Sequence, residues 1–384
     1  MGITRIADIT GLDRIGIPVC KAVQPNSKTV SVSLGKGVTP ELAKTSAAME
    51  SIEGYHAENI DLPAVRASFS ELTNQDQPTA DPAILLRSDP SIYHPDLDLF
   101  WVKGTELLNR QEIWVPLDAI SIDFTTTPEG GFYQNSNGLA SGNHLLEAVS
   151  HAICEVIERD ATAFYELGLN PSARLIELNS VDSEITQNLF SAIHRAGLEI
   201  FIRNLTHEIG IPTFMCQLYD PQRPEQFSQI KFSSGYGTHL SKEVAMLRAV
   251  TEAVQTRPAM IDGSRDNINK ADIYLNHYQG FQIIHQQHPS HRRGQVEEDY
   301  SGIPSLETDS FDEDVRLQLD LIQKRGLNQV LMVDLTKPAF NIPVVHVLIP
   351  GMEIHKPQVE LRLGERAARA KANLIMKQLD EVMS

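Results

Sequence analysis

Three segments of the chain align with one another without gaps, and this internal repeat constrains the fold more than any other feature. The segments are 35–53, 140–158 and 237–255, and each leads from a turn of small residues into a helix, over 35–58, 140–166 and 237–258. Their spacing of about 100 residues is too long for a solenoid and matches one small α/β unit each. We therefore predict repeated α/β lobes within a single domain over residues 1–384.

Short runs of β-branched residues alternate with longer amphipathic stretches, which is typical of an α/β fold with a substantial sheet. Strands are predicted at 29–33, 119–124, 198–205, 211–219, 329–335 and 342–349. Helices are predicted at 40–58, 143–166, 183–196, 240–258, 311–325 and 358–382. The polar segment 285–310 is predicted to be a surface loop. It contains His285, His288 and His291, but Pro289 interrupts any helical face on which they could bind a metal.

The charge balance excludes several classes of function. There are 33 Lys and Arg residues against 50 Asp and Glu residues, a net charge of −17. An acidic chain is poorly suited to nucleic acids or anionic membranes. No run approaches the ~20 apolar residues of a membrane span. The cysteines Cys20, Cys154 and Cys216 lie in apolar segments without metal-binding spacing, so we expect buried thiols and a cytoplasmic protein.

Each repeat helix carries polar side chains of one kind at matching positions. The pairs are Glu50/Glu53, Glu155/Glu158 and Glu252/Gln255. Residues three apart share a helix face, and Ser46, His151 and Arg248 lie one turn earlier on that face. Aligned alanines form a neighbouring strip, where small side chains would let helices pack closely; they are Ala43, Ala47, Ala148, Ala152, Ala245 and Ala249.

The apolar neighbours of these acids favour a bound cation over solvated ion pairs. Carboxylates among apolar residues are costly to ionise unless they are partnered. Mg²⁺ takes oxygen ligands, commonly one or two carboxylates together with substrate phosphates. Arginine and lysine side chains suited to phosphate lie close in sequence: Lys36, Arg159, Arg248, Arg257 and Arg265. Lys36 stands in GKGVT, which lacks the full P-loop pattern.

At these residues the sequence resembles the YcaO family. Segment 136–161, SNGLASGNHLLEAVSHAICEVIERDA, is similar to the family's central signature. Segments 35–55 and 248–267 are similar to its first and third ATP-site helices. Further matches lie at 12–19, 114–124 and 342–355. The resemblance implies a YcaO-like α/β fold in which three Glu-bearing helices line a nucleotide site.

The resemblance also implies an activity. Such proteins use ATP and Mg²⁺ to O-phosphorylate a backbone amide of a peptide or protein. A neighbouring Cys, Ser or Thr then gives an azoline (thiazoline or oxazoline), sulfide gives a thioamide and an amine gives an amidine. The implied metal ligands are Glu50, Glu53, Glu155, Glu158 and Glu252. The implied nucleotide contacts are Asn143, Glu147, Arg159, Arg248 and Gln255. From their places in the sequence, Lys36, Ser46 and Arg257 are also predicted to contact the nucleotide.

The sequence departs from the family pattern at two points: the first concerns a phosphate or structural contact, and the second bears on the product. Gly54 follows Glu53 where an arginine is usual, and no proline follows Pro357, whereas many azoline-forming members end in a Pro-rich tail. We therefore expect thioamide formation in a ribosomal peptide or protein, with a TfuA-type partner or a separate leader-peptide-binding protein. Azoline formation, a docking scaffold and a different ATP-dependent ligase or kinase are the alternatives. A homodimer is also open.

Overall fold

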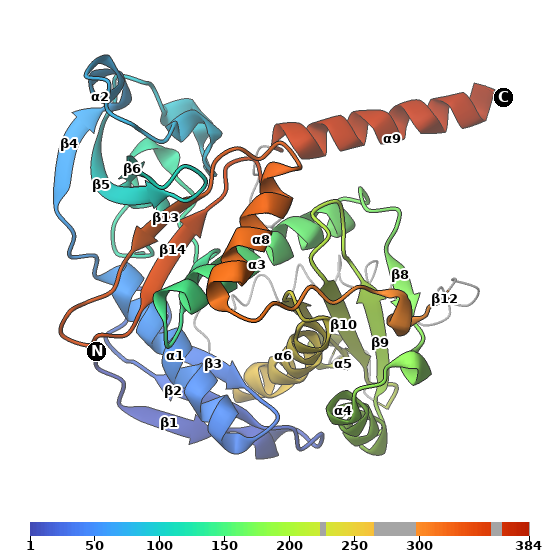
Figure 1. Ribbon diagram of the computed structural model, residues 1–384. Helices are drawn as coiled ribbons and strands as arrows, with labels where there is room; N and C mark the ends of the chain where they lie inside the picture. The colour runs from blue at the N-terminus through green and yellow to red at the C-terminus, as the bar shows by residue number, and fades with distance from the viewer. Residues whose placement is uncertain (223–227, 265–296, 355–362, 384) are drawn as a thin grey trace. The chain divides into compact units, whose positions relative to one another are not determined.

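The computed structural model describes residues 1–222, 228–264, 297–354 and 363–383 (Figure 1). It divides into two compact units. Unit 1 comprises residues 1–52, 172–206 and 212–306, and unit 2 comprises 53–171, 207–211 and 307–384. The predicted single domain over 1–384 stays a prediction. No helix among the described residues is long and apolar enough to cross a membrane.

Unit 1 contains two sheets. A small antiparallel sheet has the order β1-β2-β3, and a second has the order β11-β10-β9-β8-β12. The first strands and helix are β1 (Arg5–Asp8), β2 (Val19–Val23), β3 (Val32–Lys36) and α1 (Pro40–Glu58), which continues into unit 2. The rest are β8 (Arg174–Ile176), α4 (Glu184–Arg195), β9 (Glu199–Asn204), β10 (Thr213–Tyr219), α5 (Ser228–Lys231), β11 (Phe232–Thr238), α6 (Lys242–Asp262) and β12 (Glu297–Glu298).

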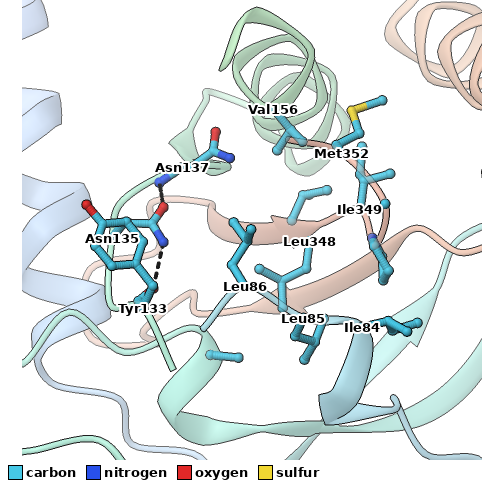
Figure 2. A pocket seen from close by; sticks show the side chains of 14 residues that line it. Ile84, Leu85, Leu86, Tyr133, Asn135, Asn137, Val156, Leu348, Ile349 and Met352 are labelled. Atoms are coloured by element: carbon cyan, nitrogen blue, oxygen red, sulfur yellow. Dashed lines mark hydrogen bonds between the residues drawn. The ribbon is translucent and has the colours of Figure 1, made fainter. Parts of the chain in front are cut away.

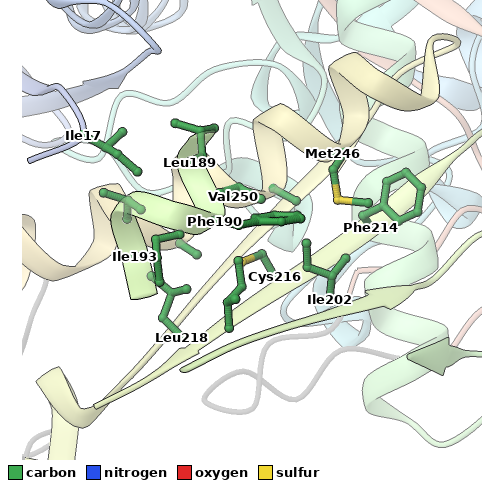
Figure 3. Packing of buried hydrophobic residues seen from close by; sticks show 14 of the residues in the cluster. Ile17, Leu189, Phe190, Ile193, Ile202, Phe214, Cys216, Leu218, Met246 and Val250 are labelled. Atoms are coloured by element: carbon green, nitrogen blue, oxygen red, sulfur yellow. The ribbon is translucent and has the colours of Figure 1, made fainter. Parts of the chain in front are cut away.

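The core of unit 1 lies between the second sheet and helices α4 and α6. Figure 3 shows Phe190 of α4 and Val250 of α6 packed near Phe214 and Cys216 of β10. The three cysteines are free and buried, as predicted. Burial also raises the pKa of the Cys216 thiol, so this thiol is a packed core group.

Unit 2 is built around one sheet with the order β4-β5-β13-β14-β7, and β6 pairs with β5. Its elements are β4 (Ala64–Ser68), α2 (Phe69–Asn74), β5 (Asp98–Glu106), β6 (Gln111–Pro116), β7 (Leu139–Ser141), α3 (Leu145–Glu166), α8 (Phe311–Gln323), β13 (Leu331–Asp334), β14 (Val344–Leu348) and α9 (Glu365–Met383). The predicted mixed α/β class is confirmed, although the strands pair antiparallel except β8 with β12.

Several predicted elements need correction. The strand expected at 119–124 is absent, because β6 ends at Pro116 and a 3-10 turn over Leu117–Ala119 follows. Ile120 and Ile122 are nevertheless buried. The strand expected at 29–33 lies at Val32–Lys36. Within the predicted loop 285–310, residues 297–310 hold strand β12 and the buried Tyr300. Residues 285–296, with the three histidines, and 358–362 lie outside the described residues.

In every repeat a strand leads through a turn into the helix: β3 into α1, β7 into α3 and β11 into α6. The six aligned alanines are all 0 % exposed. The strip faces the preceding strand rather than another helix. A Cβ on Gly35 would lie 2.1 Å from Ala47 N, and one on Gly237 would lie 2.1 Å from Ala245 O. The small residues of the repeat therefore allow strand and helix backbones to approach closely.

This close approach predicts a stability effect. Gly35→Ala would place a methyl group against the backbone of α1, and such overpacking costs about 1–3 kcal/mol. Gly54→Ala is the control, because Gly54 lies within α1 itself and no atom lies within 4 Å of the added Cβ. Gly54→Ala should stabilise the protein by about 0.5–1 kcal/mol, because glycine is unfavourable inside a helix. Urea unfolding measures both, and equal effects would contradict the close packing.

Candidate functional site

On α3, the two predicted metal ligands lie beside one arginine. The side chains of Glu155 and Glu158 are 19 % and 4 % exposed. Arg159 Nη2 lies 3.8 Å from Glu155 Oε1, and Arg159 Nη1 lies 3.9 Å from Glu158 Oε1. Both distances exceed hydrogen-bonding range, so these two contacts are ion pairs without a hydrogen bond. The structure thus brings together three of the predicted site residues on one helical turn.

Hydrogen bonds to carboxylates fix the turn that leads from β7 into α3. The residues involved are Glu53 of α1 and the predicted site residues Asn143 and Glu147. Glu53 Oε1 accepts hydrogen bonds from the backbone N of Ser141, at 2.9 Å, and from its Oγ, at 2.6 Å. Asn143 donates from its backbone N to Glu147 Oε2 at 2.7 Å. A carboxylate in the first turn of a helix is favoured by the helix dipole. Glu53 and Glu147 therefore both order the turn between β7 and α3.

In unit 1, Glu252 of α6 is the acceptor for two groups. It forms an ion pair with Lys36, which ends β3, and the backbone N of Tyr236 lies 3.4 Å from Glu252 Oε1. The side chains of Lys36 and Glu252 are 20 % and 25 % exposed. The lysine from the first repeat and the glutamate from the third are thus brought into contact. Helix α1 carries two further predicted site residues: Glu50, which is exposed, and Ser46, which is half-buried.

Two side chains on α6 hold buried polar atoms with no partner among the described residues. They are Arg248 Nε and Gln255 Oε1. Glu252 lies between them, four residues after Arg248 and three before Gln255, so all three share a helix face. A buried donor or acceptor without a partner costs free energy that a ligand can recover. An anionic oxygen would satisfy the guanidinium, and an N–H or O–H donor would satisfy the amide.

Arg257 makes buried contacts inside the protein, and its predicted nucleotide contact stays a prediction. It is 0 % exposed. Its Nε lies 2.6 Å from Asp13 Oδ2, its Nη2 lies 3.3 Å from Asp220 Oδ2, and its Nη1 donates to the carbonyl of Ile230. All three nitrogens of the guanidinium are therefore used inside the protein. Arg265, the remaining basic candidate, lies outside the described residues.

Sequence reasoning missed a buried ionic cluster next to the α3 glutamates. Asp160 is 0 % exposed, and Arg366 of α9 donates to both of its carboxylate oxygens at 3.0 Å. His207 Nε2 lies 2.6 Å from Asp160 Oδ2, and the backbone N of Glu353 donates to Oδ1 at 2.7 Å. The cluster ties α3 to the first turn of α9. An aspartate inside the apolar stretch of α3 was its only sequence signal.

The cluster predicts a pH dependence. Burial alone would raise the pKa of Asp160, but the hydrogen bond of His207 and the charge of Arg366 lower it below the ordinary value. A lowered pKa adds stability above the unfolded-state pKa of about 3.9, and this is lost as the pH falls through the folded value. Urea unfolding from pH 5 down to pH 2 should therefore show a shallower fall for Asp160→Asn than for the wild type. Parallel curves would contradict this, and Asp312→Asn, on the surface, is the control.

The donor set suits a magnesium ion shared with phosphates. Among the described residues, no three His, Cys, Asp or Glu side chains form a group that could hold a metal ion by themselves. Mg²⁺ seldom uses such an all-protein cage and is usually bound by one or two carboxylates, with phosphate oxygens and water completing its shell. The adjacent carboxylates of Glu155 and Glu158 fit this kind of site, in which they would supply the protein ligands.

Comparisons with known proteins agree on one family. A family model described as YcaO cyclodehydratase, ATP- and Mg²⁺-binding, matches residues 34–353. An uncharacterised protein of Rhizobium leguminosarum bv. trifolii, named for its position in the tfuA 3′ region, is 31 % identical over 386 residues. The alignment covers 95 % of this chain and 87 % of the relative.

Two solved structures share the fold. YcaO from Methanopyrus kandleri, bound with AMPPCP and Mg²⁺, superposes with a TM-score of 0.67 at 21 % identity. The superposition covers 92 % of this chain and 86 % of the Methanopyrus protein. A heterocyclase in complex with substrate and cofactor superposes with a TM-score of 0.74 at 23 % identity over 92 % of this chain. The chain spans half of that heterocyclase, 50 % of its length.

Proposed function

Because the chain belongs to the YcaO family, we propose that it activates a backbone amide of a peptide or protein in an ATP- and Mg²⁺-dependent reaction. The family binds ATP and Mg²⁺. When bound, ATP supplies the phosphoryl group that turns the amide oxygen into a leaving group, and Mg²⁺ offsets the charge of the phosphates. The observation that carries the proposal is the pair of unpartnered buried atoms, Arg248 Nε and Gln255 Oε1, on the helix that bears Glu252.

The side chains then have distinct roles. Glu155 and Glu158, with Glu50, Glu53 and Glu252, are proposed to hold Mg²⁺. Arg159 and Arg248 are proposed to contact phosphate oxygens, since a guanidinium donates two parallel hydrogen bonds to such groups. Lys36 forms an ion pair with Glu252 and so orients that carboxylate. Amide oxygens are weak nucleophiles, so catalysis depends on positioning and on stabilising the phosphate charge.

For the product, we propose a thioamide. Sulfide would attack the activated carbon, and phosphate would leave with the former amide oxygen. This is supported by the relative whose gene lies in the tfuA 3′ region, and a TfuA-type protein is accordingly the proposed partner. Azoline formation is the second candidate, favoured by the cyclodehydratase description of the family model. Mass spectrometry of a modified peptide separates them, because a thioamide exchanges oxygen for sulfur while an azoline loses water.

Arg248→Met tests the nucleotide site. Loss of a charged hydrogen bond to a phosphate should raise the Kd for ATP with Mg²⁺ about 10- to 100-fold. Arg195→Met is the control, because Arg195 is an exposed arginine at the end of α4. Binding of a fluorescent ATP analogue measures both Kd values. Unchanged affinity in the Arg248 variant would remove this residue from the site.

A further inference from the structure

Unit 2 contains a small apolar pocket that none of the proposed roles uses (Figure 2). Aliphatic side chains make most of its lining: Ile84, Leu85, Leu86, Val156, Leu348, Ile349 and Met352. Tyr133, Asn135 and Asn137 form a polar wall on one side. Ile84, at the end of the 3-10 turn Pro82–Ile84, is 53 % exposed and marks the mouth.

The size of the pocket limits what can occupy it. Its volume is about 40 Å³. Since a single water needs about 10–15 Å³, the space takes roughly three heavy atoms. A nucleotide or a drug-sized molecule is far too large, because such ligands occupy pockets of about 300–1,000 Å³. Three carbon atoms correspond to the side chain of valine, and the aliphatic lining disfavours a charged group.

Hydrogen bonds hold the polar wall in place, and another fixes the backbone of Val347, which also lines the pocket. Asn135 Nδ2 donates to the carbonyl of Tyr133 at 2.7 Å, and Asn135 Oδ1 accepts from the backbone N of Asn137 at 2.9 Å. The backbone N of Val347 donates to the carbonyl of Gly138 at 2.8 Å. A preformed pocket costs little ordering when a group enters it, which favours binding.

The pocket shares one helix, α3, with the proposed site. Val156, which lines it, lies on α3 between Glu155 and Glu158. A helix rises 1.5 Å per residue, so Val156 lies within one turn of both glutamates along the axis, while its side chain points to a different face of α3. Of the groups that the proposed reaction requires, only the peptide carries a short aliphatic side chain.

We propose that this pocket binds a short aliphatic side chain, of about the size of valine, from the peptide that the protein modifies. The peptide nature of the ligand rests on the proposed function, while the size and polarity of the bound group rest on the pocket itself. The pocket then acts as a specificity determinant on the helix that bears Glu155 and Glu158.

Disulfide capture at the mouth tests this on the full chain without ATP or Mg²⁺. Ile84→Cys supplies a thiol at the mouth, and the three native cysteines are buried. The variant is incubated with cystamine derivatives that carry isobutyryl, succinyl or indole-acetyl groups. Mercaptoethanol is present as the thiol for disulfide exchange. Intact-mass spectrometry measures the captured fraction. The matched control is Ile92→Cys, which is also 53 % exposed, ends the equivalent 3-10 turn Pro90–Ile92 and does not line the pocket.

We expect at least 10-fold greater capture of isobutyryl than of succinyl or indole-acetyl by Ile84→Cys, and no such selectivity by Ile92→Cys. Adding Leu86→Trp to Ile84→Cys should fill the pocket and remove the selectivity. Equal capture of the three groups by Ile84→Cys, or the same preference at Ile92→Cys, would overturn the proposal. Because nucleotide is absent, failure here leaves the proposed ATP site untouched, and failure of ATP binding leaves this readout unchanged.

Discussion

Glu158→Gln is expected to weaken Mg²⁺-dependent ATP binding about 100-fold, the upper end of what loss of one group around a metal costs. The Glu158 side chain is 4 % exposed, and its contact with Arg159 is 3.9 Å long. A nearly buried carboxylate is costly to ionise unless positive charge approaches it. Glutamine keeps the shape and removes only the charge, so the protein should still fold and unfold cooperatively on heating. A fluorescent ATP analogue and a thermal melt measure the two quantities.

Glu166→Gln is the matched control for this change. Glu166 ends the same helix and is exposed, so its replacement should alter neither affinity nor the thermal midpoint. Wild-type affinity of the Glu158→Gln variant for ATP in the presence of Mg²⁺ would contradict the role assigned to this carboxylate. A variant that fails to fold would show a structural role instead.

Arg257→Met should lower the free energy of unfolding by about 3–5 kcal/mol, because removing one partner of a buried ion pair leaves the other charge uncompensated. The side chain of Arg257 is 0 % exposed, and those of Asp13 and Asp220 are 4 % and 0 % exposed. Methionine fills much of the volume and donates no hydrogen bond. Urea unfolding of the full chain measures the change.

The control is Arg316→Met. Arg316 forms an exposed pair with Asp312 on α8, with side chains 63 % and 50 % exposed. Exposed pairs contribute about 0–1 kcal/mol, so this variant should unfold close to the wild type. If Arg257→Met instead kept wild-type stability and lost ATP affinity, Arg257 would be a nucleotide contact, as the sequence alone had suggested.

The helices could be predicted well because their signals are local. The helix predicted at 40–58 is α1, Pro40–Glu58, and α3 begins only two residues after its predicted start. Strand β11 has the sequence FSSGYGT, whose glycines and serines give little strand signal. Its Gly235 and Gly237 are instead required by the close approach of α6. This requirement is tertiary, so no pattern within the strand reveals it.

The candidate site divides in the same way. The resemblance to the YcaO family and the fold it implied are confirmed by the family model and by the solved structures. The roles of the individual glutamates stay predictions. The buried contacts of Arg257 were not predicted because its partner Asp13 lies 244 residues away in sequence, and the Asp160 cluster was missed because Arg366 lies 206 residues away. Sequence spacing reports which residues share a helix face, but not which distant charge meets them.

The measurement that tests the central claim most directly is isothermal titration of the full chain with a non-hydrolysable ATP analogue, with and without Mg²⁺. We expect saturable binding of one nucleotide per chain with Mg²⁺ and at least about 10-fold weaker binding without it, since the metal joins the carboxylates to the phosphates. Equal binding in both conditions would contradict the role of the glutamates. An absence of binding in both would contradict the proposed ATP-dependent function and favour a docking scaffold.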